Sequence, residues 1–478
     1  MKDFLAEAAR EQLKKNLHAQ AAWMFFFRQG AFRDFGKFDS LAEVWRSCIG
    51  KEGSAKSRQV MYRLLLEGEE SSGALLALSD QALGVGQAEA ALGFLGQIEA
   101  SGPGVWRYYV YLATVHTLLD DLEQAEAAMD RVRELADPKE YGPFTCFLST
   151  LVHDMEKARE LASPNTLRAA EIAFLTGRYE EAWGHYSCRL LDTEYSAPTC
   201  FPEELWDGAS RGKSIFVRVE QGLGDSVHFW RYLPKLREYF ERVVLEVDWP
   251  NFRLALSLEG VDLVVIRGSA QAASIHTEKW VPILELGRHF QVKPGFQEPY
   301  ITPPSSFLEL ECRTERPSLK VGLVWAGSAQ HARNRERSLC LNAFGCLAEV
   351  PNVQFFALQT GGAALEANWP PQNMADRIKS LEPWLLDLGD LAFALSNLDL
   401  LISVDTAPIH VAGALGVPTF ALIHHLPVWR WGLGSEKTPW YPSLTLFRQP
   451  ERGDWQGALA NVKLALQERV LSLGFDEV

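Results

Sequence analysis

From residue 214 onward, short apolar runs rich in β-branched residues alternate with stretches of helical spacing. Strands separated in this way by helices are typical of a parallel sheet with both faces covered. The expected strands lie at 215–219, 243–247, 263–266 and 281–284, and in a second series at 320–325, 354–358, 400–404 and 419–423. This alternation predicts two Rossmann-like α/β domains, the second closed by a helix over 454–472.

Residues 1–195 have the spacing of short amphipathic helices instead. Residues 107–135 predict two helices with a break near Asp120, and residues 167–191 predict another pair that is broken at Gly177. Glycine in the middle of a helical pattern favours a turn between two helices. This part of the chain is therefore expected to consist of helical hairpins.

The hairpins carry a weak repeat. Ala91 and Ala125 lie 34 residues apart, which is the period of tetratricopeptide repeats, and a degenerate hairpin around Ala158 would precede the next unit. The segment resembles a tetratricopeptide array, with an irregular helical bundle as the alternative. Such arrays stack into an extended concave surface that ordinarily holds peptides or proteins. We therefore expect this region to recognise a protein.

Two segments separate these regions. Residues 196–214 are rich in Pro, Gly and Ser and lead into the first strand, and a Pro-containing linker at 300–317 divides the two strand series. A chain of 478 residues with 47% hydrophobic content is long enough for about three cores. The expected domains are 1–195, 196–305 and 306–478.

Composition excludes several classes of function. A formal net charge of −14 argues against a nucleic-acid partner, because such proteins need a concentrated basic surface. The charged first residues lack the apolar core of a signal peptide, and no apolar run approaches the roughly 20 residues of a membrane span. The seven cysteines are scattered without zinc-ligand spacing, which favours reduced structural thiols. We expect a cytoplasmic protein.

The first motif whose residues could take part in a reaction is Glu220-Gln-Gly-Leu-Gly-Asp225, which follows an expected strand and opens an expected helix. Glycines there let the backbone approach a ligand, and a helix N-terminus attracts anions. Asp225 would stand at the mouth of a cleft, where a carboxylate can accept a proton from an attacking hydroxyl. The alternative is that Asp225 serves only as a cap of its helix.

The second motif, at 404–418, is a buried strand followed by a helix with small residues that ends at a Gly-Val-Pro sequence. Its first helical turn is a potential anion site. Thr406 would bond a phosphate and Asp405 a sugar or ribose hydroxyl, while His410 would neutralise pyrophosphate charge. An isolated histidine on a helix is more often a packed or capped residue, and the surrounding motif is what favours a ligand role for His410.

The third motif is the strand at 321–325, which leads into Ala-Gly-Ser and then a basic stretch at 333–338. Arginine offers a planar, permanently charged fork to phosphate oxygens. Arg337 and Ser338 are the preferred phosphate ligands. A solvated surface loop is the alternative, and it suits Arg333 and Arg335 better than Arg337.

Taken together, these strings resemble the tetratricopeptide-repeat glycosyltransferases of bacteria. The similar strings are WDGASRGK, VEQGLGDSVHFWRYLPKL, KVGLVWAGS, FFALQTG, LISVDTAPIHVAGALGVPT and the tail WRWGLGSEKTPWYPSLTLFRQPERGDW. The catalytic half is similar to the heptosyltransferases of lipopolysaccharide synthesis and, more distantly, to protein O-GlcNAc transferase. The resemblance covers about residues 205–470 and implies a GT-B fold, with the site in the cleft between two Rossmann-like domains.

The resemblance also implies an inverting transfer from a nucleotide sugar, without a metal or other cofactor. It makes Asp225 the general base. The implied donor-binding residues are Gly327, Ser328, Arg337, Ser338, Gln359, Asp405, Thr406 and His410, and the implied cleft loop comprises Glu220, Gln221, Gly222 and Gly224. One departure is that heptosyltransferases commonly place a lysine among the phosphate ligands after the first strand of the second domain, where this chain offers Arg337.

Proteins with this layout include flagellin glycosyltransferases that attach nonulosonic acids to Ser or Thr, so flagellin is a suggested acceptor. Two other hypotheses remain: a saccharide-modifying enzyme whose repeats serve assembly, and a protein-binding scaffold that kept the fold and lost the chemistry. Donor hydrolysis in the absence of an acceptor would distinguish an enzyme from a scaffold.

Overall fold

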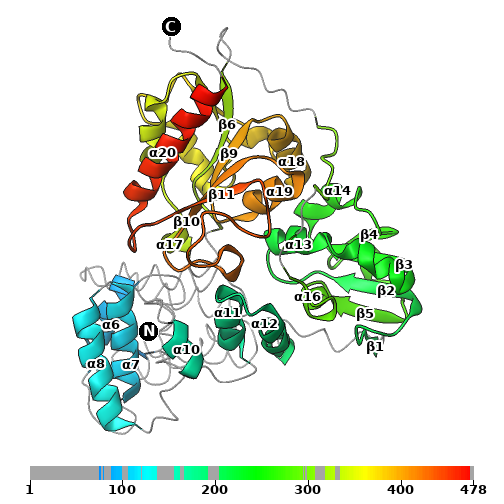
Figure 1. Ribbon diagram of the computed structural model, residues 1–478, viewed down its shortest axis with the longest axis horizontal. Helices are drawn as coiled ribbons and strands as arrows, with labels where there is room; N and C mark the ends of the chain where they lie inside the picture. Colours follow the sequence, from blue (N-terminus) through cyan, green and yellow to red (C-terminus); the bar gives the residue numbers. More distant parts are fainter. Residues whose placement is uncertain are drawn as a thin grey trace, which may run out of the picture. The chain divides into compact units, whose positions relative to one another are not determined.

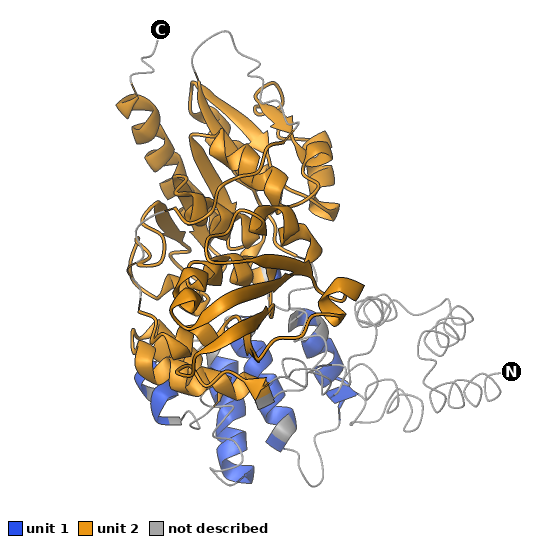
Figure 2. Cartoon of the chain, turned by 90° about the vertical axis from the view of Figure 1, so that its right-hand side faces the viewer, with its two compact units in different colours: residues 1–161, 329–334 blue, residues 162–328, 335–478 orange. Residues whose placement is uncertain are grey.

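The computed structural model describes residues 75–76, 79, 88–98, 106–119, 121–136, 155–161, 166–191, 204–293, 295, 299–306, 318–328 and 334–473. The chain divides into two compact units, of which the first comprises residues 1–161 and 329–334, and the second residues 162–328 and 335–478 (Figure 2). The hairpin at 166–191, which the sequence analysis assigned to the helical region, is thus part of the second unit. No helix within the described ranges is long and apolar enough to cross a membrane.

The described helices of the first unit are α6 (Ala88–Leu95), α7 (Trp106–Leu118), α8 (Leu122–Leu135) and α10 (Met155–Leu161). The expected break between α7 and α8 is confirmed, and the Asp121 carboxylate caps α8 by accepting a hydrogen bond from the Gln124 N–H at 3.3 Å. Val110 and Ala113 of α7 pack on Met129 of α8. Helices are therefore confirmed in the described part of this segment, and the tetratricopeptide repeat stays a prediction.

A helical hairpin opens the second unit, with α11 (Leu167–Leu175), α12 (Tyr179–Tyr186) and the 3-10 helix η1 (Ser187–Leu191). The Thr166 hydroxyl caps α11, and Gly177, at a φ of 75°, makes the expected turn. Trp183 of α12 is buried and donates its indole N–H to the Val292 carbonyl at 2.8 Å. The hairpin is therefore packed into the α/β part of the molecule.

The first sheet is parallel, with the order β1-β5-β2-β3-β4 (Figure 1). Its strands are β1 (Glu204–Leu205), β2 (Gly212–Arg218), β3 (Phe240–Val247), β4 (Leu263–Ile266) and β5 (Lys279–Pro282). The helices between them are α13 (Leu223–Trp230), η2 (Leu233–Glu238), η3 (Trp249–Asn251), α14 (Phe252–Ala255), α15 (Ala270–Ala273) and α16 (Glu285–His289). Pro234 lies in the first turn of η2, which is separate from α13, and β3 starts at Phe240.

The second sheet is also parallel, with the order β11-β10-β9-β6-β7-β8. Its strands are β6 (Leu319–Val324), β7 (Val353–Ala357), β8 (Ile378–Ser380), β9 (Leu400–Val404), β10 (Thr419–Ile423) and β11 (Leu444–Arg448). The helices are α17 (Asn334–Arg337), η4 (Leu341–Glu349), η5 (Gly362–Asn368), η6 (Glu382–Trp384), α18 (Leu388–Ser396), α19 (Ala407–Leu415), η7 (Trp429–Trp431) and α20 (Trp455–Ser472). This strand order is that of dinucleotide-binding α/β domains. The prediction of two parallel α/β sheets is confirmed.

Candidate functional site

The second sheet has a topological switch point between β6 and β9. These two strands are neighbours, but the chain leaves β6 toward β7 and β9 toward β10, on opposite sides. Ligands of open α/β sheets bind in the crevice that such a divergence leaves at the carboxyl ends of the strands. The third sequence motif follows β6 and the second follows β9, so the fold places both at this crevice.

Arg337 connects the two motifs. Its Nη1 donates a hydrogen bond to the main-chain oxygen of Asp405 at 3.0 Å. Its guanidinium also lowers the pKa of the Asp405 carboxyl, but burial raises that pKa by more. The structure thus brings together Arg337 and Asp405, which are 68 residues apart in the sequence.

The loop after β6 is shaped by two of the predicted donor-binding residues. The Gln359 Oε1 accepts hydrogen bonds from the Trp325 and Ala326 N–H groups at 3.1 and 2.9 Å, and its Nε2 donates to the Ala326 carbonyl at 3.1 Å. The Ser338 hydroxyl oxygen accepts the Gly327 N–H at 3.0 Å. Both ends of the Gln359 amide are therefore occupied by main chain, which makes Gln359 a support of the loop.

Asp405 and Thr406 occupy the junction between β9 and α19. Asp405 is 3% exposed, and its Oδ2 has no hydrogen-bond partner within the described part of the chain. Thr406 is the N-cap residue of α19, but its side chain makes no cap hydrogen bond. A buried acceptor and a half-buried hydroxyl thus lie at a helix N-terminus, where a bound anion would be favoured.

His410 is a buried histidine packed among aromatic residues. Its ring is 6% exposed, stacks on Trp431 with centroids 5.5 Å apart, and places Nδ1 2.9 Å from the Tyr441 hydroxyl. Burial lowers the pKa of His410 well below its ordinary value, and nearby guanidinium groups lower it further. The lowered pKa favours the neutral imidazole, and a role of His410 beside a pyrophosphate stays a prediction.

Asp225 lies in the first turn of α13. Its Oδ2 accepts the Gly222 N–H at 3.0 Å, and its Oδ1 forms an ion pair with Nη2 of Arg430. The Asp225 side chain is 22% exposed, whereas that of Arg430 is only 5% exposed. The carboxylate thus caps its helix and, at the same time, faces a buried guanidinium.

Arg430 is a site residue that the motif analysis missed. It belongs to η7, and its guanidinium lies 4.3 Å from the centroid of the Trp429 ring. The available signal was an arginine between two tryptophans in the string Trp429-Arg-Trp431, because large aromatic rings can bury a guanidinium. Arg430 adds a second positive charge to a cluster in which only Arg337 was expected.

Gly224 explains how the two halves of the site come together. A Cβ atom on Gly224 would lie 2.5 Å from Cδ2 of His410 and 3.2 Å from Cα of Ala407. Only a glycine fits such a contact, so α13 and α19 pack with their first turns adjacent. The N-terminus that carries Asp225 is thereby held against the helix that follows Asp405.

The remaining predicted residues have simpler positions. Glu220 is buried in an ion pair with Arg189, and Gln221 is hydrogen-bonded to Tyr186, so both have intramolecular partners. Gly222 is the N-cap of α13, and Ser328 is exposed at the end of the loop after β6.

Comparisons with known proteins give limited similarity. No family model matches the chain. Protein FlbA of Caulobacter vibrioides is 27% identical over 358 residues, which make up 66% of this chain. The chain spans 58% of the length of that relative.

Among solved structures, the E. coli heptosyltransferase WaaC with ADP has 11% identity and a TM-score of 0.38, over 54% of this chain and 99% of that chain. A glycosyl transferase of family 9 from Veillonella parvula has 15% identity and a TM-score of 0.37, over 55% and 97%. An O-GlcNAc transferase variant from Thermobaculum terrenum has 12% identity and a TM-score of 0.33, over 92% and 93%.

Proposed function

We propose that the protein is a GT-B glycosyltransferase that moves a sugar from a nucleotide-sugar donor to a Ser or Thr hydroxyl of a protein acceptor in the cytoplasm. The observation that carries this proposal is the convergence of one carboxylate with two arginines at a switch point. Asp225, Arg430 and Arg337 come from separate parts of the sequence and lie around the adjoining first turns of α13 and α19. A proton acceptor beside an anion site is what transfer from a sugar phosphate requires.

In the proposed reaction, the acceptor hydroxyl attacks the anomeric carbon and loses its proton to Asp225. The bond between that carbon and the phosphate oxygen breaks, and the electron pair leaves with the phosphate. Arg337, Arg430 and the N-terminus of α19 would stabilise the negative charge that develops there. Attack opposite the leaving group inverts the anomeric centre, and the two guanidinium groups supply the charge for which other enzymes use a metal.

The donor would bind mainly on the second sheet. The Asp405 Oδ2, which lacks a hydrogen-bond partner among the described residues, would accept a donor hydroxyl, and Thr406 would bond a phosphate oxygen. A neutral His410 would act through packing and hydrogen bonding. The acceptor would be held by the helical region, and flagellin modified with a nonulosonic acid is the acceptor suggested by the sequence resemblance.

The test is to incubate the full-length protein with a panel of nucleotide sugars, including nucleotide-activated nonulosonic acids, and to measure nucleotide release with and without flagellin. We expect slow release without an acceptor, faster release with it, and a mass increase on flagellin from cells that carry the gene. A sugar on glycolipid instead of flagellin would favour the saccharide-modifying alternative. Absence of both nucleotide binding and release would identify a scaffold.

A further inference from the structure

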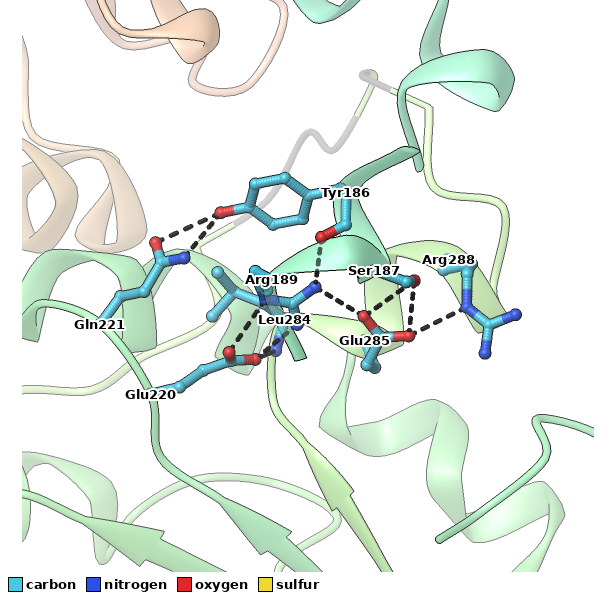
Figure 3. Close-up of polar contacts among 8 residues, drawn as sticks. All are labelled: Tyr186, Ser187, Arg189, Glu220, Gln221, Leu284, Glu285 and Arg288. Carbon is cyan, nitrogen blue, oxygen red and sulfur yellow. Dashed lines mark hydrogen bonds and ion pairs between the residues drawn. The ribbon is translucent and has the colours of Figure 1, made fainter. Parts of the chain in front are cut away.

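A buried ion-pair network lies at the carboxyl ends of β2 and β5, and Figure 3 shows its residues. Strands β2 and β5 are neighbours there, and the chain leaves them toward α13 and α16. Arg189 of η1 pairs with Glu220, which follows β2, and with Glu285 at the start of α16. The Arg189 side chain is 0% exposed. A buried side chain of the helical hairpin thus joins the segments that follow these two strands.

The network is closely bonded. Nε and Nη2 of Arg189 donate to the two carboxylate oxygens of Glu220 at 3.0 and 2.7 Å, and Nη1 donates to Oε1 of Glu285 at 2.6 Å. Glu220 also accepts the Leu284 N–H at 2.9 Å. Burial by itself raises the pKa of Glu285, but Arg189 and the hydrogen bonds outweigh burial and lower it. Both carboxylates therefore have hydrogen-bond partners, and the lowered pKa favours the charged form of Glu285.

A second tie joins the same hairpin to the next residue of the loop. Gln221 has a φ of 60°, which is unusual for a residue other than glycine, and its Nε2 donates to the Tyr186 hydroxyl at 2.8 Å. The Tyr186 carbonyl in turn accepts Nη1 of Arg189 at 3.1 Å. Glu220 and Gln221 are thus both anchored to the segment 186–189, as Figure 3 shows.

These anchors lie immediately before the candidate catalytic turn. Gly222 follows Gln221 and donates its N–H to the Asp225 carboxylate at 3.0 Å. A change in the backbone at Gln221 would rotate the Gly222 N–H and release one oxygen of Asp225. The path from the hairpin to Asp225 consists of adjacent residues and hydrogen bonds, without a gap.

We propose that Arg189 and Tyr186 are positioning residues that fix the 220–222 turn and thereby orient the Asp225 carboxylate. This proposal rests on the function proposed above, in which Asp225 is the general base. The hairpin at 166–191 is then a built-in part of the catalytic unit. Loss of either anchor lets Gln221 return to a negative φ, which misplaces Asp225 relative to the acceptor hydroxyl.

The informative variant is Tyr186→Phe, because it removes one hydroxyl and keeps the ring whose centroid lies 4.6 Å from the Arg189 guanidinium. We expect kcat to fall roughly 10- to 100-fold, with little change in the donor KM, since small misplacements of a reacting group have effects of this size. Amide hydrogen exchange over residues 220–225 should become faster. Arg189→Lys, which keeps the charge and loses the planar fork, should have the same effects in greater degree.

Arg288→Gln is the matched control, because Arg288 pairs with Glu285 at 2.9 Å but has no bond to the 220–222 turn. It should lower the melting temperature and leave kcat and exchange at 220–225 unchanged. If Tyr186→Phe retains both the wild-type kcat and the wild-type exchange, the positioning role is wrong, although the protein remains an enzyme. If the wild type transfers no sugar, the function is wrong, and the exchange measurement still decides whether Tyr186 holds the turn.

Discussion

At the scale of single residues, the contacts of Asp225 bear on the two roles that the sequence left as alternatives, a helix cap and a general base. Its Oδ2 caps α13 through Gly222, while its Oδ1 faces Arg430. A cap and a catalytic base are thus compatible uses of one carboxylate, because each uses a different oxygen.

Asp225→Asn separates the two uses. The asparagine oxygen can still accept the Gly222 N–H, but the buried Arg430 guanidinium loses its carboxylate, so the melting temperature should fall while the folded protein still binds the donor. Transfer should fall by roughly 10²-fold or more, the usual scale for loss of a general base. Initial rates at saturating donor, together with thermal melting, check this. Wild-type turnover in the variant would reduce Asp225 to a helix cap.

Arg337→Ala tests the anion site. The Arg337 guanidinium lies at the junction of the second and third motifs, so its removal should weaken nucleotide binding by about 1.5–3 kcal/mol, the typical worth of a charge-assisted hydrogen bond. Calorimetric titration with several nucleotides measures the loss of binding free energy and shows which nucleobase the donor carries. Arg237→Ala is the control, because Arg237 pairs with Asp262 on the exposed surface of the first sheet and should leave affinity unchanged. Equal affinities in wild type and Arg337→Ala would move the donor site elsewhere.

At the scale of elements, the packing of α13 on α19 assembles the site. Gly224 permits the contact, and beyond it the Tyr441 hydroxyl lies within 3.0 Å of Nδ1 of His228 on α13 and within 2.9 Å of Nδ1 of His410 on α19. One hydroxyl can donate to a ring whose Nδ1 is unprotonated and accept from a ring whose Nδ1 carries a proton, and two neutral rings of opposite tautomer provide this arrangement; burial lowers the pKa of both rings and so favours their neutral forms. The two helices are therefore joined by a neutral hydrogen-bonded bridge.

Gly224→Ala should loosen this packing. The added methyl would lie 2.5 Å from His410 Cδ2, and overpacking of this kind costs typically about 1–3 kcal/mol of unfolding free energy. Denaturant unfolding measures the loss, and nucleotide affinity should fall with it. Gly184→Ala on α12 is a matched control, because no atom lies within 4 Å of its added Cβ. Equal stability of the two variants would show that the helices do not depend on this contact.

The same bridge predicts a pH dependence of stability. Burial lowers the folded pKa of His228 and His410 well below 6.5, with the Arg231 and Arg430 charges lowering it further. A depressed folded pKa gives stability that is present above pH 6.5 and lost as the pH falls, because the unfolded chain then binds protons that the folded chain excludes. The loss of stability grows as the pH falls further below 6.5.

The melting temperature should therefore fall between pH 7 and pH 5, and His228→Gln should flatten the decline. His276→Gln is the control, because His276 is exposed. A decline of unchanged slope in His228→Gln would place the responsible protons elsewhere in the molecule.

The helices and strands could be predicted from the sequence where a clear hydrophobic pattern marks them. The strands at 263–266, 400–404 and 419–423 match β4, β9 and β10, because continuous apolar runs identify buried parallel strands. The short edge strands β1 and β8 have two and three residues and too little pattern to detect. Arg430 and Tyr441 were not identified as site residues from the sequence. Both lie in the segment between β10 and β11, where no periodicity indicates which side chains are buried.

At the scale of the whole molecule, the sequence predicted a boundary near residue 196 between the part of the chain that recognises the acceptor and the part that catalyses transfer. The structure instead includes the hairpin at 166–191 in the second unit, through Trp183, Tyr186 and Arg189. The sequence could not show this, because the hairpin has the same helical pattern as the segments before it, and its partners lie 31 to 109 residues further along the chain. The division that the compact units favour lies at residue 161.

Two truncated proteins test this division. One that begins at Ala162 keeps Arg189, whereas one that begins at Pro202 leaves Glu220 and Glu285 buried without it. Removing one partner of a buried ion pair costs about 3–5 kcal/mol, so the Pro202 protein should melt without cooperativity or aggregate, while the Ala162 protein should show a cooperative transition and bind nucleotide.

The Ala162 protein should also hydrolyse the donor slowly yet lose most of its transfer to the protein acceptor. The reason is that the preceding helices, as a repeat surface, would hold the acceptor at high effective concentration beside the site. Rates at limiting acceptor compare it with the full chain, and the fragment 1–161 should capture the acceptor in a pull-down. If the folded Ala162 protein glycosylates its acceptor as fast as the full chain, the first unit serves assembly or localisation instead, and acceptor choice resides in the catalytic unit.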